Sequence, residues 1–239
     1  MHFGKIVPRR PRVFLPGQPI YLTQRGHNRS QVFYGPDDAK NFLTWLQDAG
    51  NKHGLSFHAY VLMTNQIHLL VTPESEQALP KALRDVNWHY TRYINRAHNR
   101  SGSLWDGRYK ACIVEAEIYF LACSHYIELE PVRAGIANEP ESYRWSSHKA
   151  NAEGEKNSLL TPHALYLRLG HSPETRSNAY KNFCKEELSE TTVTAIRTAT
   201  KGGWALGNDE FSGKVSNYAG CNMAPRGPGR PWPEKTKVG

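Results

Sequence analysis

Two pairs of polar side chains stand at spacings that place each pair on one face of its element. In the strand-like run 66–71, Gln66 and His68 share a face because side chains alternate along a strand. Tyr126 and Glu130 are four residues apart, so a helix would bring them side by side. The first pair suits a divalent cation, and the second suits a nucleophile beside a metal ligand or base. Each pair alone also fits a structural role, as a polar strand residue or as a tyrosine packed on a sheet.

The periodicity of apolar residues predicts the elements that would position these side chains. Helical stretches carry an apolar stripe, and β-prone runs are bounded by turn residues. Strands are expected at 20–25, 56–63, 66–72 and 105–114, and helices at about 37–52, 76–98 and 115–130. This order predicts an α+β fold, a ferredoxin-like split βαβ antiparallel sheet with helices on one face and a catalytic helix following it.

The two middle strands are predicted to form a hairpin with a two-residue turn at 64–65. Ile67, Leu69 and Val71 would then pack under the helices, and the opposite face would be open and carry the polar pair. The last helix should end before Pro131, because proline is incompatible with a helix interior.

The chain is predicted to divide into four parts of different composition. They are a basic N-terminal arm (1–19), the catalytic α+β domain (20–150), a mostly helical C-terminal extension (151–212) and a flexible basic tail (213–239). The tail contains the run RGPGRP at 226–231, which is similar to the core of an AT-hook.

The charge of the chain favours an anionic partner. Thirty Lys and Arg against 22 Asp and Glu give a net charge of +8, and neutralised phosphates release counterions when a basic protein binds nucleic acid. A basic but otherwise ordinary enzyme is the plainer interpretation. The four cysteines show no metal-ligand spacing and are expected to be structural. The sequence has no signal peptide and no run of about 18 apolar residues, which predicts a cytoplasmic protein without a membrane partner.

Several basic and aromatic residues are candidates for contacts with DNA. The arginines lie in the N-terminal arm, beside the first strand and at a helical spacing on the second helix, and two aromatic residues near another arginine offer stacking surface. The candidates are Arg9, Arg10, Arg12, Arg25, Arg29, Arg92, Arg96, Arg100, Trp105, Arg108 and Tyr109. For each arginine the alternative is a solvated surface residue, and for Trp105 it is a place in the core.

Five segments, in order along the chain, resemble one family. They are LTQRGHNR at 22–29, AYVLMTNQIHLLV at 59–71, GSLWDGRYK at 102–110, YIELEPVRAG at 126–135 and YRWSS at 143–147. Together they resemble the REP-associated tyrosine transposases, relatives of the insertion-sequence transposases of the single-tyrosine HUH class. The resemblance extends from about residue 8 to residue 230.

The resemblance implies an activity, a cofactor and a partner. In such enzymes two histidines bind a divalent metal, Mg²⁺ or Mn²⁺, and a tyrosine, here Tyr126, attacks single-stranded DNA. A 5′-phosphotyrosine link forms and a 3′-hydroxyl is released. The DNA partner would be a hairpin with a REP-like palindrome, the location bacterial and nucleoid-associated, and a homodimer is one arrangement that the family allows.

Two residues depart from the family pattern. The position of the first histidine holds Gln66, and the amide ligand four residues after the tyrosine is replaced by Glu130. We interpret this as a compensated exchange, in which His68, Gln66 and Glu130 together form the metal site. Two oxygen donors and one nitrogen suit Mg²⁺ or Mn²⁺.

Two other functions compete with this hypothesis. One is a catalytically impaired protein that keeps the fold and binds hairpin DNA, which the replacement at Gln66 favours. The other is a metal-dependent hydrolase of small substrates, although the chain has no HExxH, GxSxG or P-loop motif.

Overall fold

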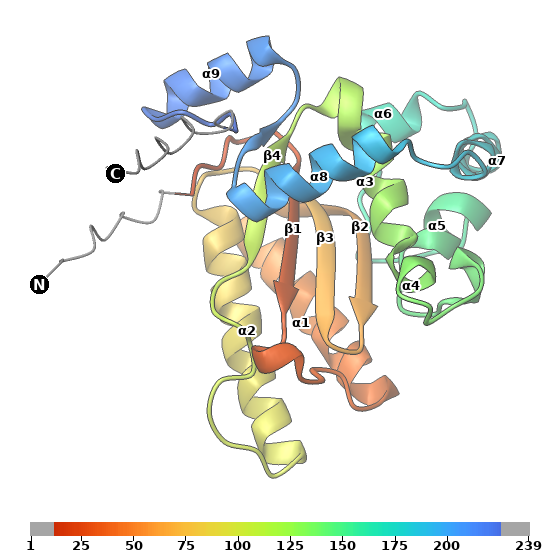
Figure 1. Cartoon of the computed structure of the whole chain (residues 1–239). Helices are drawn as coiled ribbons and strands as arrows, with labels where there is room; N and C mark the ends of the chain where they lie inside the picture. The colour runs from red at the N-terminus through yellow and green to blue at the C-terminus, as the bar shows by residue number, and fades with distance from the viewer. Residues whose placement is uncertain (1–11, 226–239) are drawn as a thin grey trace, which may run out of the picture.

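The computed structural model describes residues 12–225 and shows a five-stranded sheet with helices around it (Figure 1). The strands are β1 (Ile20–Arg25), β2 (Leu55–Met63), β3 (Gln66–Pro73), β4 (Lys110–Val114) and β5 (Ala205–Leu206). The long helices are α1 (Pro36–His53), α2 (Ala78–Ala97), α3 (Ala116–Glu128), α7 (Pro173–Cys184), α8 (Glu190–Gly202) and α9 (Asp209–Ala219). The short helices are η1 (His27–Arg29), α4 (Glu130–Arg133), η2 (Pro140–Ser142), α5 (His148–Glu153) and α6 (Ala164–Leu167).

The strand order β2-β3-β1-β4-β5 contains the predicted ferredoxin-like core. The first four strands pair antiparallel, and β2 and β3 form the predicted hairpin with its turn at 64–65. A fifth strand that the sequence did not predict, β5, pairs parallel with β4 at the edge of the sheet. The α+β fold class is therefore confirmed, with one added strand.

The first face of the sheet is covered by α1 and α2. Ile67, Leu69 and Val71 point to this side and are fully buried together with Phe42 of α1 and Tyr90 of α2. The alternation that was used to orient β3 is thus correct, because the apolar positions of the strand share one face.

The second face is covered as well, so the expectation of helices on one face only was wrong. Tyr21 and Leu70 on this side pack against Ile127 of α3 and Ile196 of α8, and Figure 1 shows α3 and α8 lying over the sheet. Strand β2 is buried at every position except Ser56, which is half-buried. A strand without polar alternation needs cover on both sides.

Helix α3 is connected to the C-terminal helices through a buried carboxylate. Glu128 is completely buried and accepts hydrogen bonds from Ser147 Oγ (2.6 Å), Asn151 Nδ2 (2.8 Å) and the Tyr180 hydroxyl (3.0 Å). The ring of His148 lies 3.2 Å from the same carboxylate. Since buried charges are stable only when well hydrogen-bonded, this network fixes the end of α3 against α5 and α7.

Three further boundaries differ from the prediction. The strand expected at 105–114 begins only at Lys110. Trp105 pairs with Gly26 in an isolated bridge outside the strand. The last helix ends at Glu128, and Pro131 lies in the first turn of the short helix α4, where a missing N–H is tolerated. Residues 213–219, placed in the tail by composition, belong to α9, which packs on the β4–β5 edge. The AT-hook-like run 226–231 lies outside the described residues. Within residues 12–225, no helix is long and apolar enough to cross a membrane.

Candidate active site

Tyr126, His68 and Glu130 meet between α3 and the second face of the sheet. His68 projects from β3 on this face, and its Nε2 lies 3.9 Å from Oε2 of Glu130. The ring of Tyr21 connects the two sides, because it stacks on His68 and meets Tyr126 edge-on, each at a centroid distance of 5.9 Å. One chain therefore brings together the phenol, the imidazole and the carboxylate that the sequence singled out.

Two polar atoms of this cluster are buried without a hydrogen-bond partner. They are Nε2 of His68 and Oε1 of Glu130. The other ring nitrogen of His68, Nδ1, lies 2.6 Å from the hydroxyl of Tyr21. When Nδ1 donates its proton to that oxygen, Nε2 presents a lone pair. Nε2 of His68 lies 3.9 Å from Oε2 of Glu130, and Oε1 of the same carboxylate lies 3.5 Å from Nη1 of Arg133. An imidazole nitrogen without a hydrogen bond beside a carboxylate suits a divalent cation.

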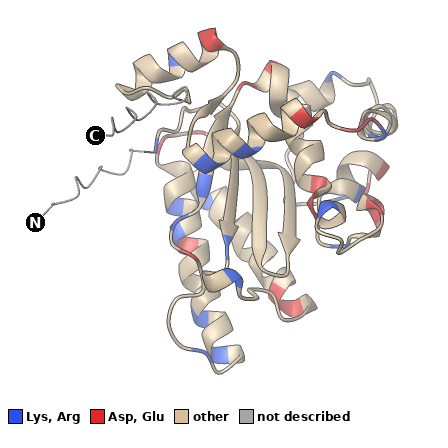
Figure 2. Cartoon of the chain, in the orientation of Figure 1, with Lys and Arg blue, Asp and Glu red and all other residues tan. Residues whose placement is uncertain are grey.

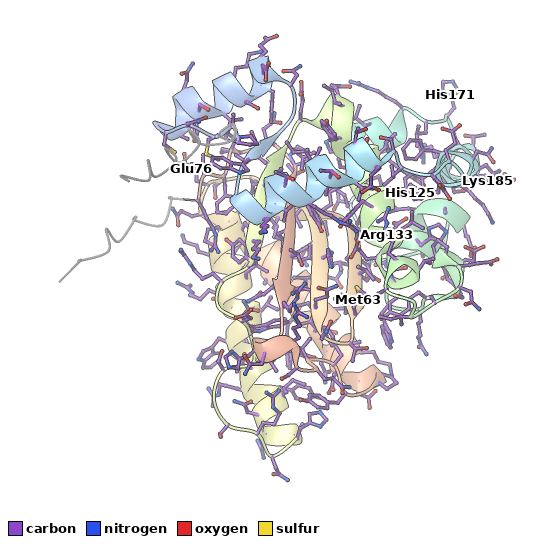
Figure 3. The ribbon with its side chains drawn as sticks, viewed as in Figure 1. Met63, Glu76, His125, Arg133, His171 and Lys185 are labelled. Atoms are coloured by element: carbon purple, nitrogen blue, oxygen red, sulfur yellow. The ribbon has the colours of Figure 1, made fainter. Side chains whose placement is uncertain are left out.

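Gln66 does not join this cluster. Its Oε1 accepts a hydrogen bond from Nη2 of Arg25 (3.4 Å), and its Nε2 lies 3.3 Å from Sδ of Met63. Figure 3 labels Met63 at the end of β2. The side chain is directed along the hairpin end, so the cation donors presented within the described residues are His68 and Glu130. No group of three His, Cys, Asp or Glu in residues 12–225 could hold a metal.

Burial shifts the pKa of both functional rings. Desolvation is the main cause that lowers the pKa of His68 to about 4, although the nearby Glu130 opposes it. The imidazole is therefore neutral at pH 7 and able to act as a ligand. Burial, followed by the negative charge of Glu130, raises the pKa of Tyr126 to about 12. The Tyr126 hydroxyl is therefore protonated at pH 7.

Two arginines that the sequence analysis missed surround Tyr126. Arg197 of α8 donates from Nε to the Tyr126 hydroxyl at 3.2 Å. Arg133, labelled on α4 in Figure 3, lies with its guanidinium 4.5 Å from the Tyr126 ring centroid and donates to the Tyr126 backbone carbonyl at 3.0 Å. Arg133 also pairs with Oε1 of Glu130 at 3.5 Å. The segment YIELEPVRAG includes Arg133, but only the fold brings Arg197 to the site.

The predicted DNA contacts lie at several places on the surface. Arg9 and Arg10 are outside the described residues. Arg25 and Arg29 are exposed beside η1, where Asn28 and Arg29 take positive φ angles of 51° and 59°. In Figure 2 the basic segments follow α2 and α8. Arg92, Arg96 and Arg108 are exposed as expected.

Three of the predicted contacts have a different environment from that expected. Arg100 lies beyond the end of α2 and donates to the Tyr34 hydroxyl at 2.9 Å, so it does not continue the helical stripe. Trp105 and Tyr109 are only 6% and 7% exposed and belong to the core that faces α1 and α2. Their rings therefore stabilise the fold and offer little stacking surface, because the loop before β4 packs inward.

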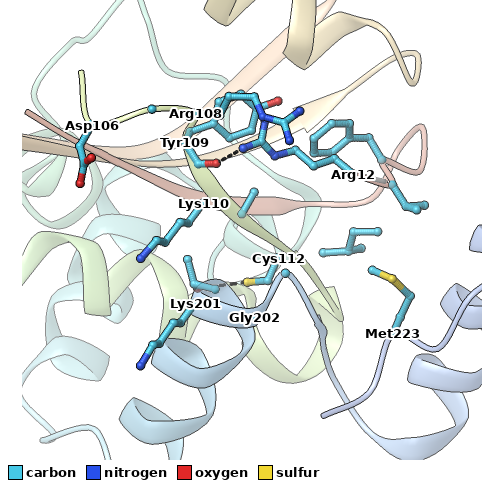
Figure 4. Close-up of a pocket in the computed structure, with 16 residues that line it drawn as sticks. Arg12, Asp106, Arg108, Tyr109, Lys110, Cys112, Lys201, Gly202 and Met223 are labelled. Carbon is cyan, nitrogen blue, oxygen red and sulfur yellow. Dashed lines mark hydrogen bonds between the residues drawn. The ribbon is translucent and has the colours of Figure 1, made fainter. Parts of the chain in front are cut away.

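A basic cleft lies between β4 and the end of α8 (Figure 4). Its volume is about 550 Å³, and basic residues line it together with Asp106. Lys110 and Lys201 are exposed and lie near each other in the close-up, whereas Arg12 covers the Tyr109 ring at 4.0 Å. Lys201 is one helical turn from Arg197, so these two basic residues lie on the same side of α8.

The comparisons with known proteins agree with this architecture. Residues 20–130 match the family model described as "Transposase IS200 like". A solved structure of a REP-associated tyrosine transposase bound to a REP hairpin has a TM-score of 0.54 at 16% identity, covering 66% of this chain and 93% of that one. A proposed transposase from Deinococcus radiodurans is 21% identical over 51% of this chain and 96% of its own, with a TM-score of 0.35.

No curated protein matches the chain. The matched region contains the whole ferredoxin-like core and ends at Glu130, so it includes the phenol, the imidazole and the carboxylate of the site. Over residues 20–130, the chain is similar to the IS200-like transposase family.

Proposed function

We propose that this protein cuts and rejoins single-stranded DNA at hairpins with REP-like palindromes, through a 5′-phosphotyrosine intermediate on Tyr126 and with Mg²⁺ or Mn²⁺. The match of residues 20–130 to the IS200-like transposase model supports a transposase-type function in DNA processing. The observation that carries the finer proposal is the meeting of Tyr126 with the unsatisfied atoms of His68 and Glu130.

The reaction would be a transesterification that needs no external energy source. The phenolic oxygen of Tyr126 bonds to phosphorus, and the bond from phosphorus to the 3′-oxygen breaks. The phenol loses its proton to solvent, and the released 3′-oxygen gains one. Because one phosphoester replaces another, the reverse step can rejoin a strand.

The residues of the chain would prepare this step in three ways. Arg133 holds the ring and backbone of Tyr126, which directs the hydroxyl toward the sheet. Tyr21 orients the imidazole of His68, and burial keeps that ring neutral. His68 and Glu130 would hold the cation, which when bound would polarise the phosphate and stabilise its developing charge. Lys110 and Lys201 would contact the phosphates of the adjacent strand.

A second function is favoured by Gln66, which stands where the family has a histidine. Its oxygen is engaged by Arg25 and its amide nitrogen faces Met63, so it adds no donor to the cluster. With fewer ligands, the chain would bind hairpin DNA without cutting it. A homodimer and a nucleoid-associated, cytoplasmic location stay predictions for either function.

The test uses labelled single strands that carry a REP-like hairpin with flanking sequence, incubated with Mn²⁺. The proposal expects a covalent protein–DNA adduct and a free 3′-hydroxyl product from the wild type, and neither from Tyr126→Phe. Tyr119→Phe removes a hydroxyl from the same helix that is not part of the group formed by Tyr126, His68 and Glu130, so this variant should keep its activity. Hairpin binding without any cut product from the wild type would instead establish the second function.

A further inference from the structure

We propose that Arg197 is a catalytic residue, which the C-terminal extension contributes to the site. The inference rests on the proposed function and deepens it, because it assigns a role to a helix outside the matched residues 20–130. Its basis is the contact between the Arg197 guanidinium and the hydroxyl that would attack the DNA.

The position of Arg197 is fixed by the helix that carries it. On the buried side of α8, Val193, Ile196 and Ala199 pack into the core of the second face. Oγ1 of Thr200 lies 3.4 Å from Sγ of Cys112 on β4, which adds a polar contact to the sheet. Arg197 lies on the exposed side of α8 and still reaches Tyr126. The guanidinium is therefore held by a packed helix and is open to a ligand.

Arg197 places a positive charge next to the Tyr126 oxygen, where negative charge would develop during the reaction. The Tyr126 side chain is almost completely buried, where negative charge on its oxygen is costly, and Nε of Arg197 lies 3.2 Å from that oxygen. Arg133 is the other cation nearby, but its contacts are with the ring and backbone of Tyr126 and with Glu130. Among the described contacts, Arg197 is therefore the cation that touches the reacting oxygen itself.

The geometry of the guanidinium leaves donors for the DNA. Arginine has five N–H donors in a planar fork, and Nε is the atom bonded to the Tyr126 hydroxyl. The two Nη atoms make no hydrogen bond with the residues at 12–225. The Nη atoms could therefore bind a phosphate oxygen, since arginine often binds phosphates with two N–H donors. That phosphate would lie next to the Tyr126 oxygen.

Arg197 would therefore act in both directions of the reaction. In cleavage, it stabilises negative charge on the phenolic oxygen as the bond to phosphorus forms and the bond to the 3′-oxygen breaks. In rejoining, the same oxygen is the leaving group, and the 3′-hydroxyl gives up its proton to solvent. A preorganised donor of this kind contributes roughly 100-fold or more to a rate.

The experiment compares single-turnover cleavage and hairpin affinity in four variants. Arg197→Gln removes the charge, and Arg197→Lys keeps it without the planar fork. Thr198→Ala alters the neighbouring exposed position of α8, and Lys185→Ala removes a distant positive charge of the extension, labelled in Figure 3. We expect Arg197→Gln to cut roughly 100-fold more slowly and Arg197→Lys to recover part of the rate. Both should bind the hairpin within about threefold of the wild type, and the two controls should cut normally.

A substrate with a changed leaving group tests whether Arg197 stabilises the phenolic oxygen or the 3′-oxygen. A substrate with sulfur in place of the bridging 3′-oxygen has a better leaving group. If Arg197 acts on the phenol, the defect of Arg197→Gln persists with this substrate.

Four results would overturn the inference while leaving the proposed function intact. They are a wild-type rate in Arg197→Gln, a loss of affinity as large as the loss of rate, an equal defect in Thr198→Ala, and a defect that disappears with the sulfur substrate. A wild-type chain that forms no covalent adduct would overturn both. Circular dichroism and urea unfolding verify the fold, and Arg197→Lys remains informative if Arg197→Gln is unstable.

Discussion

The hydroxyl of Tyr21 lies 2.6 Å from Nδ1 of His68, across the two adjacent strands β1 and β3. The two rings also stack, and both are almost completely buried. Nε2 of the same imidazole has no hydrogen bond and faces Glu130. A proton held on Nδ1 by the Tyr21 hydroxyl would leave the lone pair of the ring on Nε2, directed toward Glu130.

Replacing Tyr21 by Phe should weaken both the fold and the site. The change leaves a buried Nδ1 without its partner, which costs about 1–3 kcal/mol of the free energy of unfolding. It should also reduce the gain in melting temperature that Mn²⁺ produces, because the imidazole loses its orientation. Urea unfolding and thermal scans with and without Mn²⁺ measure the two effects. A variant with unchanged values in both would show that the hydrogen bond does not orient the ring.

Replacing Gln66 by His should strengthen cation binding. The position is half-buried at the start of β3 and tolerates an imidazole, which would add the donor that Gln66 does not supply. We expect a larger Mn²⁺-induced shift in melting temperature and faster cleavage than in the wild type. Gln66→Ala serves as the control for loss of the contact with Arg25. Equal Mn²⁺ responses in Gln66→His and Gln66→Ala would show that an imidazole at this position does not reach the cation.

Replacing Glu128 by Ala should destabilise the protein strongly. The change leaves the hydroxyl, amide and imidazole groups of the network without their acceptor, and breaking such a buried set costs about 3–5 kcal/mol. Tyr180→Phe removes only one of these donors and should cost about 1 kcal/mol. Urea denaturation of both variants measures the difference. Similar losses for the two variants would mean that the carboxylate is not the centre of the network.

The stability of the protein should decrease in mild acid, partly because of His58. Its Nδ1 lies 2.7 Å from the Thr161 carbonyl and its Nε2 lies 2.8 Å from Thr72 Oγ1, which satisfies the neutral ring. Burial lowers the pKa of His58 from 6.5 to about 4. The unfolded chain therefore binds a proton below pH 6.5, whereas the folded chain binds it only near pH 4. This contribution is complete above pH 6.5 and is lost between these values, up to about 3 kcal/mol.

Urea unfolding at several values between pH 7 and pH 4 checks this dependence. His58→Gln should be less stable at pH 7 but should lose less stability on acidification. The dependence will not vanish, because the pKa of His68 is lowered to about 4 as well. An acid dependence as steep in His58→Gln as in the wild type would exclude the role of His58.

The basic cleft should be detectable in the salt dependence of DNA binding. Lys110→Ala and Lys201→Ala each remove one cation that lines it. If each lysine contacts a phosphate, each change should reduce the slope of log K against log salt by about 0.7. Affinities for different sequences should decrease together, since phosphate contacts carry no sequence information. Lys185→Ala, a change far from the cleft, should keep the wild-type slope, and an equal reduction in that variant would show that general charge is responsible.

Local patterns predicted the core of the fold and the proximity of Tyr126 and Glu130 in the candidate site. Alternation in β3 gave the correct buried face, and the spacing of four residues placed Tyr126 and Glu130 together although the helix is interrupted at Leu129. Such periodicities act over a few residues, so they are visible in the sequence. The nearly unbroken apolar content of β2 was a signal for a second covering layer, which the prediction of an open face overlooked.

The missing parts of the site depend on contacts between distant segments. Tyr126 and Arg197 are 71 residues apart, and Tyr21 and His68 are 47 residues apart. Only tertiary packing decides such pairs. The orientation of Gln66 is equally a matter of its neighbours, because Arg25 binds the oxygen that was expected to face a cation. Trp105 was offered as a stacking residue or as core, and its burial favours the core.

The described part of one chain brings the phenol, the imidazole and the carboxylate into one place. Under the proposed function, each molecule would carry one attacking oxygen and would therefore hold one DNA end at a time. If one such site suffices for the proposed reaction, turnover per molecule should be insensitive to dilution. Exchange between two ends would then require either successive rounds on one molecule or a meeting of two molecules that are each already loaded.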